Sequence, residues 1–234
     1  MTAKPKSRTI QTIGELAERF MALVLKTSGL TPSQVRILYS PHFMENTSLT
    51  RCPWATSDSL YISYHDTEWG RPLHDDQKLF ELLCLEGQQA GLSWITVLKK
   101  RENYRKAFQN FSPSYVAQYD AKKVEELLQD SGIIRNKLKI NSVIQNAQSF
   151  AKIQNEFKNF DSYIWQFVSG KPIINHWERL DQVPSETDIS AMMSKDLKKR
   201  GFNFVGSTIC YSFMQAAGLI NDHITSCFCY KELV

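Results

Sequence analysis

Apolar side chains recur through most of the chain at the three- and four-residue intervals of amphipathic helices. This pattern predicts helices over residues 75–84, 121–129, 140–151, 161–168, 187–200 and 205–217. No stretch shows a convincing alternation of apolar and polar residues, the pattern of a half-buried strand. With ordinary helix and loop lengths, we expect an all-α domain of about seven to nine helices.

Residues 1–50 have a pattern of their own. Thr12 and Glu15 have the spacing of a capping box, and apolar residues follow at helical intervals. Residues 40–50 are rich in small polar side chains and are typical of a linker. We therefore expect an N-terminal helical extension and linker over 1–50, and one domain over 51–234.

One segment, residues 202–221, runs for 20 residues without a charge, which is the length of a membrane span. Its polar side chains and two glycines favour a helix buried in a soluble core instead. Those side chains are Asn203, Ser207, Thr208, Ser212, Gln215 and Asn221. The first apolar run, 20–25, is too short for a signal peptide, and five scattered cysteines do not resemble a disulfide scaffold. We expect a cytoplasmic protein without membrane contact.

The formal net charge of +4 is carried entirely by the start of the chain. Residues 1–51 hold seven Lys/Arg and three Asp/Glu, whereas residues 52–234 hold 21 of each. Binding to nucleic acid would therefore depend on local clusters. Residues 99–101 and 198–200 are candidate phosphate contacts, although such charged runs usually mark a solvated face. The composition, with 42% hydrophobic and 12% aromatic residues, excludes a disordered chain.

Cysteine and histidine occur near both ends of the predicted domain. Cys52 lies thirteen residues before His65, and His223 lies four residues before Cys227. A closed set of two cysteines and two histidines suits a structural zinc ion, one per chain, that joins the start of the domain to its end. Two alternatives stay open: these residues are ordinary buried side chains, or Cys229 replaces Cys227 as a ligand.

The segment around Glu86 is unusual for a core helix. Glu86 follows an apolar run and precedes Gly87, and Gly91 interrupts the pattern before Trp94. A carboxylate on the apolar side of a helix end, next to small residues, is typical of a pocket for a flat polar ligand. The alternative is a solvated glutamate at a helix terminus. Nearby aromatic rings could stack on a nucleobase or a cation, or could belong to the core. They are Trp54, Tyr61, Tyr64 and Trp69.

Three runs of sequence closely resemble one family. They are RCPWATSDSLYISYHDTEWG (51–70), LFELLCLEGQQAGLSWITVLKKRENYRKAF (79–108) and KKRGFNFVGSTICYSFMQAAGLINDH (198–223). They resemble 3-methyladenine DNA glycosylase I, the constitutive bacterial family of the helix-hairpin-helix glycosylase superfamily, over about residues 51–230. The resemblance implies an all-α helix-hairpin-helix DNA glycosylase fold with a zinc clip joining the N- and C-terminal parts of the domain.

The resemblance also implies roles for particular residues. The zinc ligands would be Cys52, His65, His223 and Cys227. The base pocket would be lined by Tyr64, Glu86 and Trp94. Leu92 would belong to the segment that plugs the DNA at the lesion. Weaker DNA contacts would come from Gly132, Arg135 and Lys137 in the hairpin, with Lys139 adding charge, although Gly132 is equally an ordinary helix C-cap.

The implied activity is that of a monofunctional DNA-3-methyladenine glycosylase in base-excision repair. Such an enzyme flips the lesion base out of double-stranded alkylated DNA and hydrolyses its glycosidic bond, leaving an abasic site. Methylation at N3 makes the adenine cationic, so Trp94 and Tyr64 would contact the ring and Glu86, the candidate catalytic residue, would accept hydrogen bonds. Two alternatives are a noncatalytic, zinc-stabilised damage-binding module and a hydrolase of another cationic nucleobase. We expect a monomer without an obligate protein partner.

Overall fold

The computed structural model describes residues 49–55 and 58–234 of the chain. The helix and most of the linker predicted within residues 1–50 lie outside the described residues. Two units can be separated along the backbone, Met1–Leu49 and Thr50–Val234, and every described residue except Leu49 belongs to the second.

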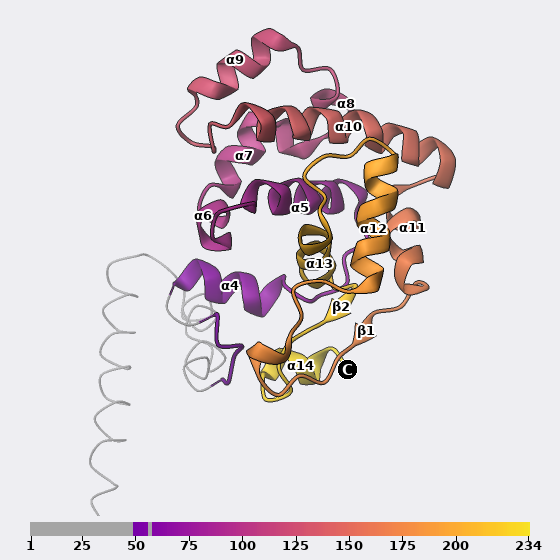
Figure 1. Ribbon diagram of the computed structural model, residues 1–234. Helices are drawn as coiled ribbons and strands as arrows, with labels where there is room; N and C mark the ends of the chain where they lie inside the picture. Colours follow the sequence, from indigo (N-terminus) through magenta and orange to yellow (C-terminus); the bar gives the residue numbers. More distant parts are fainter. Residues whose placement is uncertain (1–48, 56–57) are drawn as a thin grey trace, which may run out of the picture. The chain divides into compact units, whose positions relative to one another are not determined.

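The described part of the second unit is almost entirely helical (Figure 1). Its helices are α4 (Ser59–Thr67), α5 (Asp76–Gln89), α6 (Trp94–Leu98), α7 (Arg101–Ala107), α8 (Pro113–Val116), α9 (Ala121–Gln129), α10 (Lys137–Phe157), α11 (Phe160–Trp165), α12 (Asp188–Lys199), α13 (Ser207–Ala216) and α14 (Phe228–Glu232). Three 3-10 turns accompany them: η1 (Gln109–Phe111), η2 (Gln166–Val168) and η3 (Leu180–Gln182). The two short strands are β1 (Ile173–Ile174) and β2 (Ile220–Asn221).

All six helices predicted from apolar spacing are present. The prediction for 121–129 coincides with α9, and that for 140–151 falls inside the longer α10. The described part holds eleven helices, more than expected, because α6, α8 and α14 have five residues or fewer. Such short helices show too little of the helical period to be recognised. The parallel pairing of β1 with β2 was also not predicted, since each strand has only two residues.

Helix α5 lies in the middle of the fold, between α10 and α13 (Figure 1). It begins after Asp75, whose side chain accepts a hydrogen bond from the backbone N–H of Lys78. Residues 79–88 of the helix are all buried. Glu86 and Gln88, near its C-terminus, are therefore carried into the interior on an otherwise apolar helix.

The two ends of the second unit lie side by side. The backbone N–H of Phe228, at the start of α14, donates to the carbonyl of Thr50 over 2.9 Å. The β1–β2 pair leads directly into residues 222–227, which connect β2 to α14. Residues separated by more than 150 positions in the sequence, such as Cys52 and His223, consequently come into contact.

Among the described residues, no helix combines the length and the hydropathy that crossing a bilayer requires. The charge-free stretch 202–221 contributes α13 and β2, and most of it is buried in the core.

Candidate functional site

Helix α4 supplies one residue to each of two buried polar sites. Tyr64 and His65 are consecutive, so their side chains point about 100° apart around the helix axis. Tyr64 lines a cavity with Glu86. His65 approaches two cysteines on another side of the same helix.

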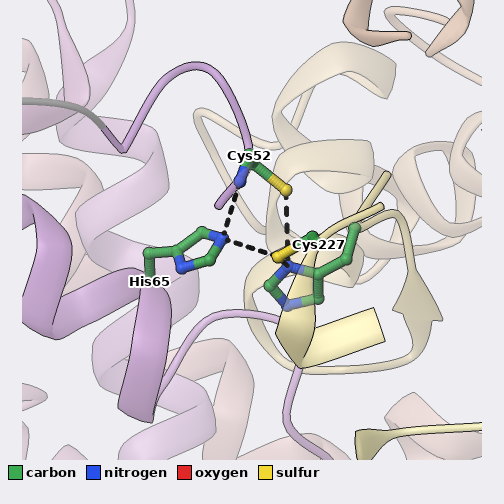
Figure 2. Close-up of side chains that lie close together, drawn as sticks. Cys52, His65 and Cys227 are labelled. Carbon is green, nitrogen blue, oxygen red and sulfur yellow. Dashed lines mark hydrogen bonds between the residues drawn. The ribbon is translucent and has the colours of Figure 1, made fainter. Parts of the chain in front are cut away.

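The first site brings together the four residues named from both ends of the domain. Cys52, His65, His223 and Cys227 are all buried, and their ligand atoms lie within 4.8 Å of one another. The Nδ1 atom of His223 is 3.4 Å from Cys52 Sγ and 3.6 Å from Cys227 Sγ, and His65 Nε2 is 3.5 Å from Cys227 Sγ. Figure 2 shows Cys52, His65 and Cys227 pointing toward one another.

These four residues fit a tetrahedral metal ion. With metal–sulfur and metal–nitrogen bonds of zinc length, ligand atoms of a tetrahedron lie about 3.3–3.8 Å apart, and the three separations above fall in this range. Each imidazole also uses its other nitrogen outside the group. His65 Nδ1 donates to Asp66 Oδ1 over 2.8 Å, and His223 Nε2 donates to the Trp69 carbonyl over 3.1 Å. Both tautomers are thereby fixed with a lone pair directed inward, as metal-binding histidines require. The group could therefore hold a metal ion.

The neighbouring Cys229 lies beside this group without being one of its four residues. Cys229 forms a second cluster with His65 and Asp66, and its Sγ lies 3.8 Å from the His65 carbonyl oxygen. Cys227, rather than Cys229, thus completes the four-residue set. Gly70 is required nearby: its φ is +78°, and a Cβ there would lie 2.8 Å from His223 Nε2.

The second site is a cavity of about 310 Å³ beside α5. Glu86 lies in its wall with 4% of its surface exposed. Burial, without a described cation or hydrogen-bond donor opposite the carboxylate, raises the pKa of Glu86 to about 8. Glu86 is therefore an interior residue facing a cavity, and the alternative of a solvated helix end is wrong.

Two aromatic residues in the cavity wall carry unused polar atoms. The ring centroids of Tyr64 and Trp94 are 5.4 Å apart, with an angle of 47° between the planes. Tyr64 Oη and Trp94 Nε1 are both buried and have no hydrogen-bond partner in the described part of the chain. Burial, and to a smaller extent the Glu86 charge, raise the pKa of the Tyr64 hydroxyl well above its ordinary value. Since buried polar groups normally have partners, these atoms are available to hydrogen-bond a ligand in the cavity.

The opposite wall of the cavity was not predicted from the sequence. It comes from η3 and the residues after it, from α13, and from Asp222. On α13 the lining residues are Thr208, Tyr211, Ser212 and Gln215. The signal was present, because Thr208, Ser212 and Gln215 follow helical spacing and mark one polar face of an apolar helix. The rings of Trp54, Tyr61 and Trp69, named from the sequence, also line this cavity.

Leu92 lies on a tight turn between α5 and α6. Gly91 has a φ of +75°, which favours glycine, and the Leu92 N–H donates to the Gln89 carbonyl over 2.6 Å. Leu92 is 42% exposed and lines a smaller adjoining cavity of about 180 Å³, in which Glu86 also takes part. The turn therefore directs Trp94 inward and Leu92 outward.

Gly132, Arg135 and Lys137 lie apart from both cavities. Gly132 and Arg135 are in the connection between α9 and α10, and Lys137 is the first residue of α10. The N–H of Gly132 donates to Asp130 Oδ1 over 2.7 Å, and a Cβ at Gly132 would lie 2.9 Å from that oxygen. Gly132 is not a left-handed C-cap, because α9 ends at Gln129 with Asp130 as its C-cap and the φ of Gly132 is not positive. Arg135 and Lys137 are exposed.

Several basic residues considered as phosphate contacts have partners inside the protein. Arg101 donates to Glu81 and Glu68, and Arg200 donates to Glu156 and Asp196. Lys100 donates to the carbonyls of Ser131 and Gly132, and Lys99 pairs with Asp58. Lys139 is buried and donates to two carbonyls. Most of this charge therefore holds the fold together.

Comparison with known proteins gives one consistent result. The sequence profile described as methyladenine glycosylase matches residues 54–230. The chain is 52% identical over 180 residues to the DNA-3-methyladenine glycosylase of Haemophilus influenzae, covering 77% of this chain and 97% of the relative. It is 53% identical over 182 residues to DNA-3-methyladenine glycosylase 1 of Escherichia coli, covering 78% and 97%.

Solved structures agree with these relatives. A crystal structure of 3-methyladenine DNA glycosylase I has a TM-score of 0.76 and 56% identity, covering 77% of this chain and 99% of that one. The Staphylococcus aureus enzyme, in a study of 3-methyladenine recognition, has a TM-score of 0.75 and 39% identity, covering 77% and 96%. By the profile match and by these identities, the chain belongs to the methyladenine glycosylase family.

Proposed function

We propose that this protein is a monofunctional DNA glycosylase that releases 3-methyladenine from alkylated double-stranded DNA and leaves an abasic site. One observation carries the proposal: a cavity large enough for a purine presents a buried carboxylate together with two aromatic rings, and within residues 49–55 and 58–234 none of the three side chains has a polar partner. The relatives that share more than half of their residues with this chain carry the name of this activity.

The cavity suits a cationic base better than a neutral one. The cation of N3-methylated adenine compensates the Glu86 carboxylate, while the rings of Tyr64 and Trp94 contact its face and edge. Neutral adenine would leave a buried carboxylate without a charge partner, at a cost of about 1–3 kcal/mol or more. Selectivity for the lesion follows from this difference.

Solved relatives support these roles. One structure is a tyrosine-to-phenylalanine variant of 3-methyladenine DNA glycosylase I in complex with 3-methyladenine, and another is a glutamate-to-glutamine variant from Staphylococcus aureus. The two substituted positions are 22 residues apart in those proteins, as Tyr64 and Glu86 are here. This shared spacing supports the assignment of Tyr64 and Glu86 to the base pocket.

The chemistry needs no strong nucleophile, because the methylated base is an activated leaving group. The electrons of the C1′–N9 bond leave with the base, which departs neutral, and water adds its hydroxide to C1′ and releases one proton. The protein contributes extrusion of the nucleotide, with Leu92 filling the gap, and a pocket in which Glu86 stabilises positive charge as the bond breaks.

We also propose a zinc ion for the Cys52, His65, His223 and Cys227 group, because two thiolates and two imidazoles match its preferred ligands. A closed set leaves no open position, so the ion would supply stability and no chemistry. The turn between α9 and α10 would be a helix-hairpin-helix motif whose backbone N–H groups, with Arg135 and Lys137, contact phosphates.

The remaining proposals concern the setting of the enzyme. We propose a cytoplasmic monomer without an obligate partner, in which residues 1–50 form an extension to a glycosylase domain over 51–234. Analytical ultracentrifugation of the full chain with and without DNA tests the monomer.

The activity is tested by incubating alkylated duplex DNA with wild-type protein and with Glu86→Gln, and identifying the released bases by chromatography. Wild type should release 3-methyladenine, and the variant should release it far more slowly. Tight binding of methylated DNA without base release would favour a damage-binding module, and release of a different base would favour the other hydrolase.

A further inference from the structure

Lys139 is a buried lysine in the first turn of α10. Only 6% of its surface is exposed, and its Nζ donates to the carbonyl oxygens of Gln88 and Ala90, both over 2.7 Å. Lys137, two residues earlier, is exposed and pairs with Glu125. A lysine whose ammonium group is enclosed by backbone carbonyls is not available to a DNA phosphate, so Lys139 has a different task from its neighbour.

The two carbonyls that Lys139 holds lie at the end of α5. Terminal carbonyls of a helix lack intrahelical partners and carry the negative end of the helix dipole, so a cation stabilises them. Ala90 is also the residue directly before Gly91 and Leu92, which form the exposed turn. The Lys139 ammonium group therefore supports the base of the turn that presents Leu92.

Further hydrogen bonds connect the same end of α5 to the turn between α9 and α10. The Gln88 side chain donates to the Lys139 carbonyl over 3.1 Å and accepts from the Tyr104 hydroxyl over 3.1 Å. The Tyr104 hydroxyl in turn accepts from the Ile134 N–H over 3.1 Å. The end of α5 is thus tied to the 130–136 turn through Ile134 and to the first turn of α10 through Lys139.

We propose that Lys139 is a positioning residue that fixes the Leu92 turn relative to the 130–136 turn, so that both meet the DNA in one register. The inference rests on the proposed function, in which Leu92 fills the gap left by the flipped base and the 130–136 turn contacts phosphates. Phosphate contacts set the register of a protein on the duplex. If Leu92 is held rigidly relative to the phosphate-binding turn, it reaches the lesion in the correct position once the turn has bound. A displacement of Leu92 by about 1 Å can lower the rate as much as a hundredfold.

Lys139 does not line the cavity that contains Glu86, which gives the proposal a selective signature. In Lys139→Met, release of 3-methyladenine from duplex DNA should fall at least about tenfold. The affinity for free 3-methyladenine, measured by calorimetry, should stay within about twofold of wild type, because the pocket is untouched. Release from single-stranded alkylated DNA should fall less than release from duplex, since no base stack has to be held open.

Two matched variants complete the experiment. Lys137→Met removes the same charge from the same helical turn, at a proposed phosphate contact, and should weaken duplex binding and lower the slope of log affinity against log salt by about one, a change of slope that Lys139→Met should not show. Tyr104→Phe keeps the buried ring but removes the hydroxyl between Gln88 and Ile134. Tyr104→Phe should also slow release from duplex DNA without changing the affinity for free 3-methyladenine, by a smaller factor than Lys139→Met. It replaces Lys139→Met as the test if that variant does not fold.

Three results would overturn the proposal. Equal losses for free base, single strand and duplex would show a general structural role, and a salt slope lowered by Lys139→Met would show a direct phosphate contact. Unchanged duplex release in both Lys139→Met and Tyr104→Phe would show that neither positions the turn. If wild type itself releases no 3-methyladenine, the proposed function fails, and that result differs from an active wild type with unaffected variants.

Discussion

The two buried polar sites of this protein differ in how their polar atoms are satisfied. In the Cys52, His65, His223 and Cys227 group, the imidazole nitrogens that face outward donate to Asp66 and to a backbone carbonyl, and the inward atoms converge on one centre. In the cavity, by contrast, Glu86 lies in the wall beside Tyr64 and Trp94, whose buried polar atoms have no hydrogen-bond partner among the described residues. One ion would satisfy all four side chains of the first site. The polar atoms of the cavity would be satisfied only while a ligand is bound there.

This difference predicts opposite responses to substitution. Disturbing the metal group should lower the free energy of unfolding, while disturbing the cavity should lower activity and raise that free energy. Unsatisfied groups in the cavity destabilise the free protein, and their removal stabilises it.

The largest effect is expected from His223→Ala. Loss of one ligand should lower the free energy of unfolding by about 4 kcal/mol, because the remaining buried thiols and imidazole lose their common partner. For a domain of this size that corresponds to a fall in Tm of roughly 10 °C or more. Scanning calorimetry together with elemental analysis of zinc measures both consequences.

Cys229→Ala is the matched control for this prediction. Cys229 is buried next to Cys227 but lies outside the four-residue group, so its removal should leave one metal per chain and change Tm by only a few degrees. Retention of zinc by His223→Ala, or its loss from Cys229→Ala, would show that the ligand set is wrong.

A smaller effect, of opposite sign on stability, is expected from Glu86→Gln. Release of 3-methyladenine from duplex DNA should fall about a hundredfold, since a neutral amide cannot compensate the cationic base. The folded-state pKa of about 8 exceeds the ordinary 4.5, so burial of Glu86 costs nothing below pH 4.5 and progressively more up to pH 8. Above pH 8 the variant should therefore be more stable than wild type by a few kcal/mol.

Denaturant titrations of wild type and Glu86→Gln at pH 5 and pH 9 measure this crossover. Similar stabilities at pH 5 and a more stable variant at pH 9 are expected. A variant that is less stable at both values would show that the carboxylate supports the fold, and the contrast between the two sites would be lost.

The two sites differ in how many of their residues could be predicted from the sequence. The four-residue group of Cys52, His65, His223 and Cys227 could be predicted, because the chain has few cysteines and histidines and because the resemblance covers both ends of the domain. The near wall of the cavity follows from the Glu86 segment, but the far wall comes from α13 and from residues 180–185, which only tertiary contact brings near. Three of the polar residues that argued against a membrane span, Thr208, Ser212 and Gln215, face the cavity. Their spacing marks a polar face of α13, but spacing alone does not show whether such a face meets solvent or a cavity.

The sequence also could not predict which basic residues would have partners inside the protein. In the sequence, Lys139 and Arg101 cannot be distinguished from the basic residues near them. In the structure, Lys139 donates to backbone carbonyls and Arg101 donates to Glu81. The partner that neutralises a charge is set by packing among α5, α7 and α10, and that packing depends on residues far apart in the chain.

The activity should depend on pH through the ionisation of Glu86. If the Glu86 carboxylate is the form that binds the cationic nucleotide, kcat/KM should rise about tenfold per pH unit between pH 6 and pH 8 and level off above. The same profile for Glu86→Gln should be flat. Single-turnover rates on duplex DNA across this range test the assignment, and a parallel slope in both proteins would place the titrating group elsewhere.

The smallest effect is expected from Tyr64→Phe, which separates the two sites within one helix. The substitution removes a buried hydroxyl that has no partner among the described residues, so the free energy of unfolding should rise by up to about 1 kcal/mol. Affinity for free 3-methyladenine should fall about five- to tenfold, because one hydrogen bond to the base is lost. The zinc content should not change, although His65 is the next residue of α4 and belongs to the metal group. Calorimetric titration and elemental analysis measure these quantities, and a loss of zinc from Tyr64→Phe would mean that the two faces of α4 do not act independently.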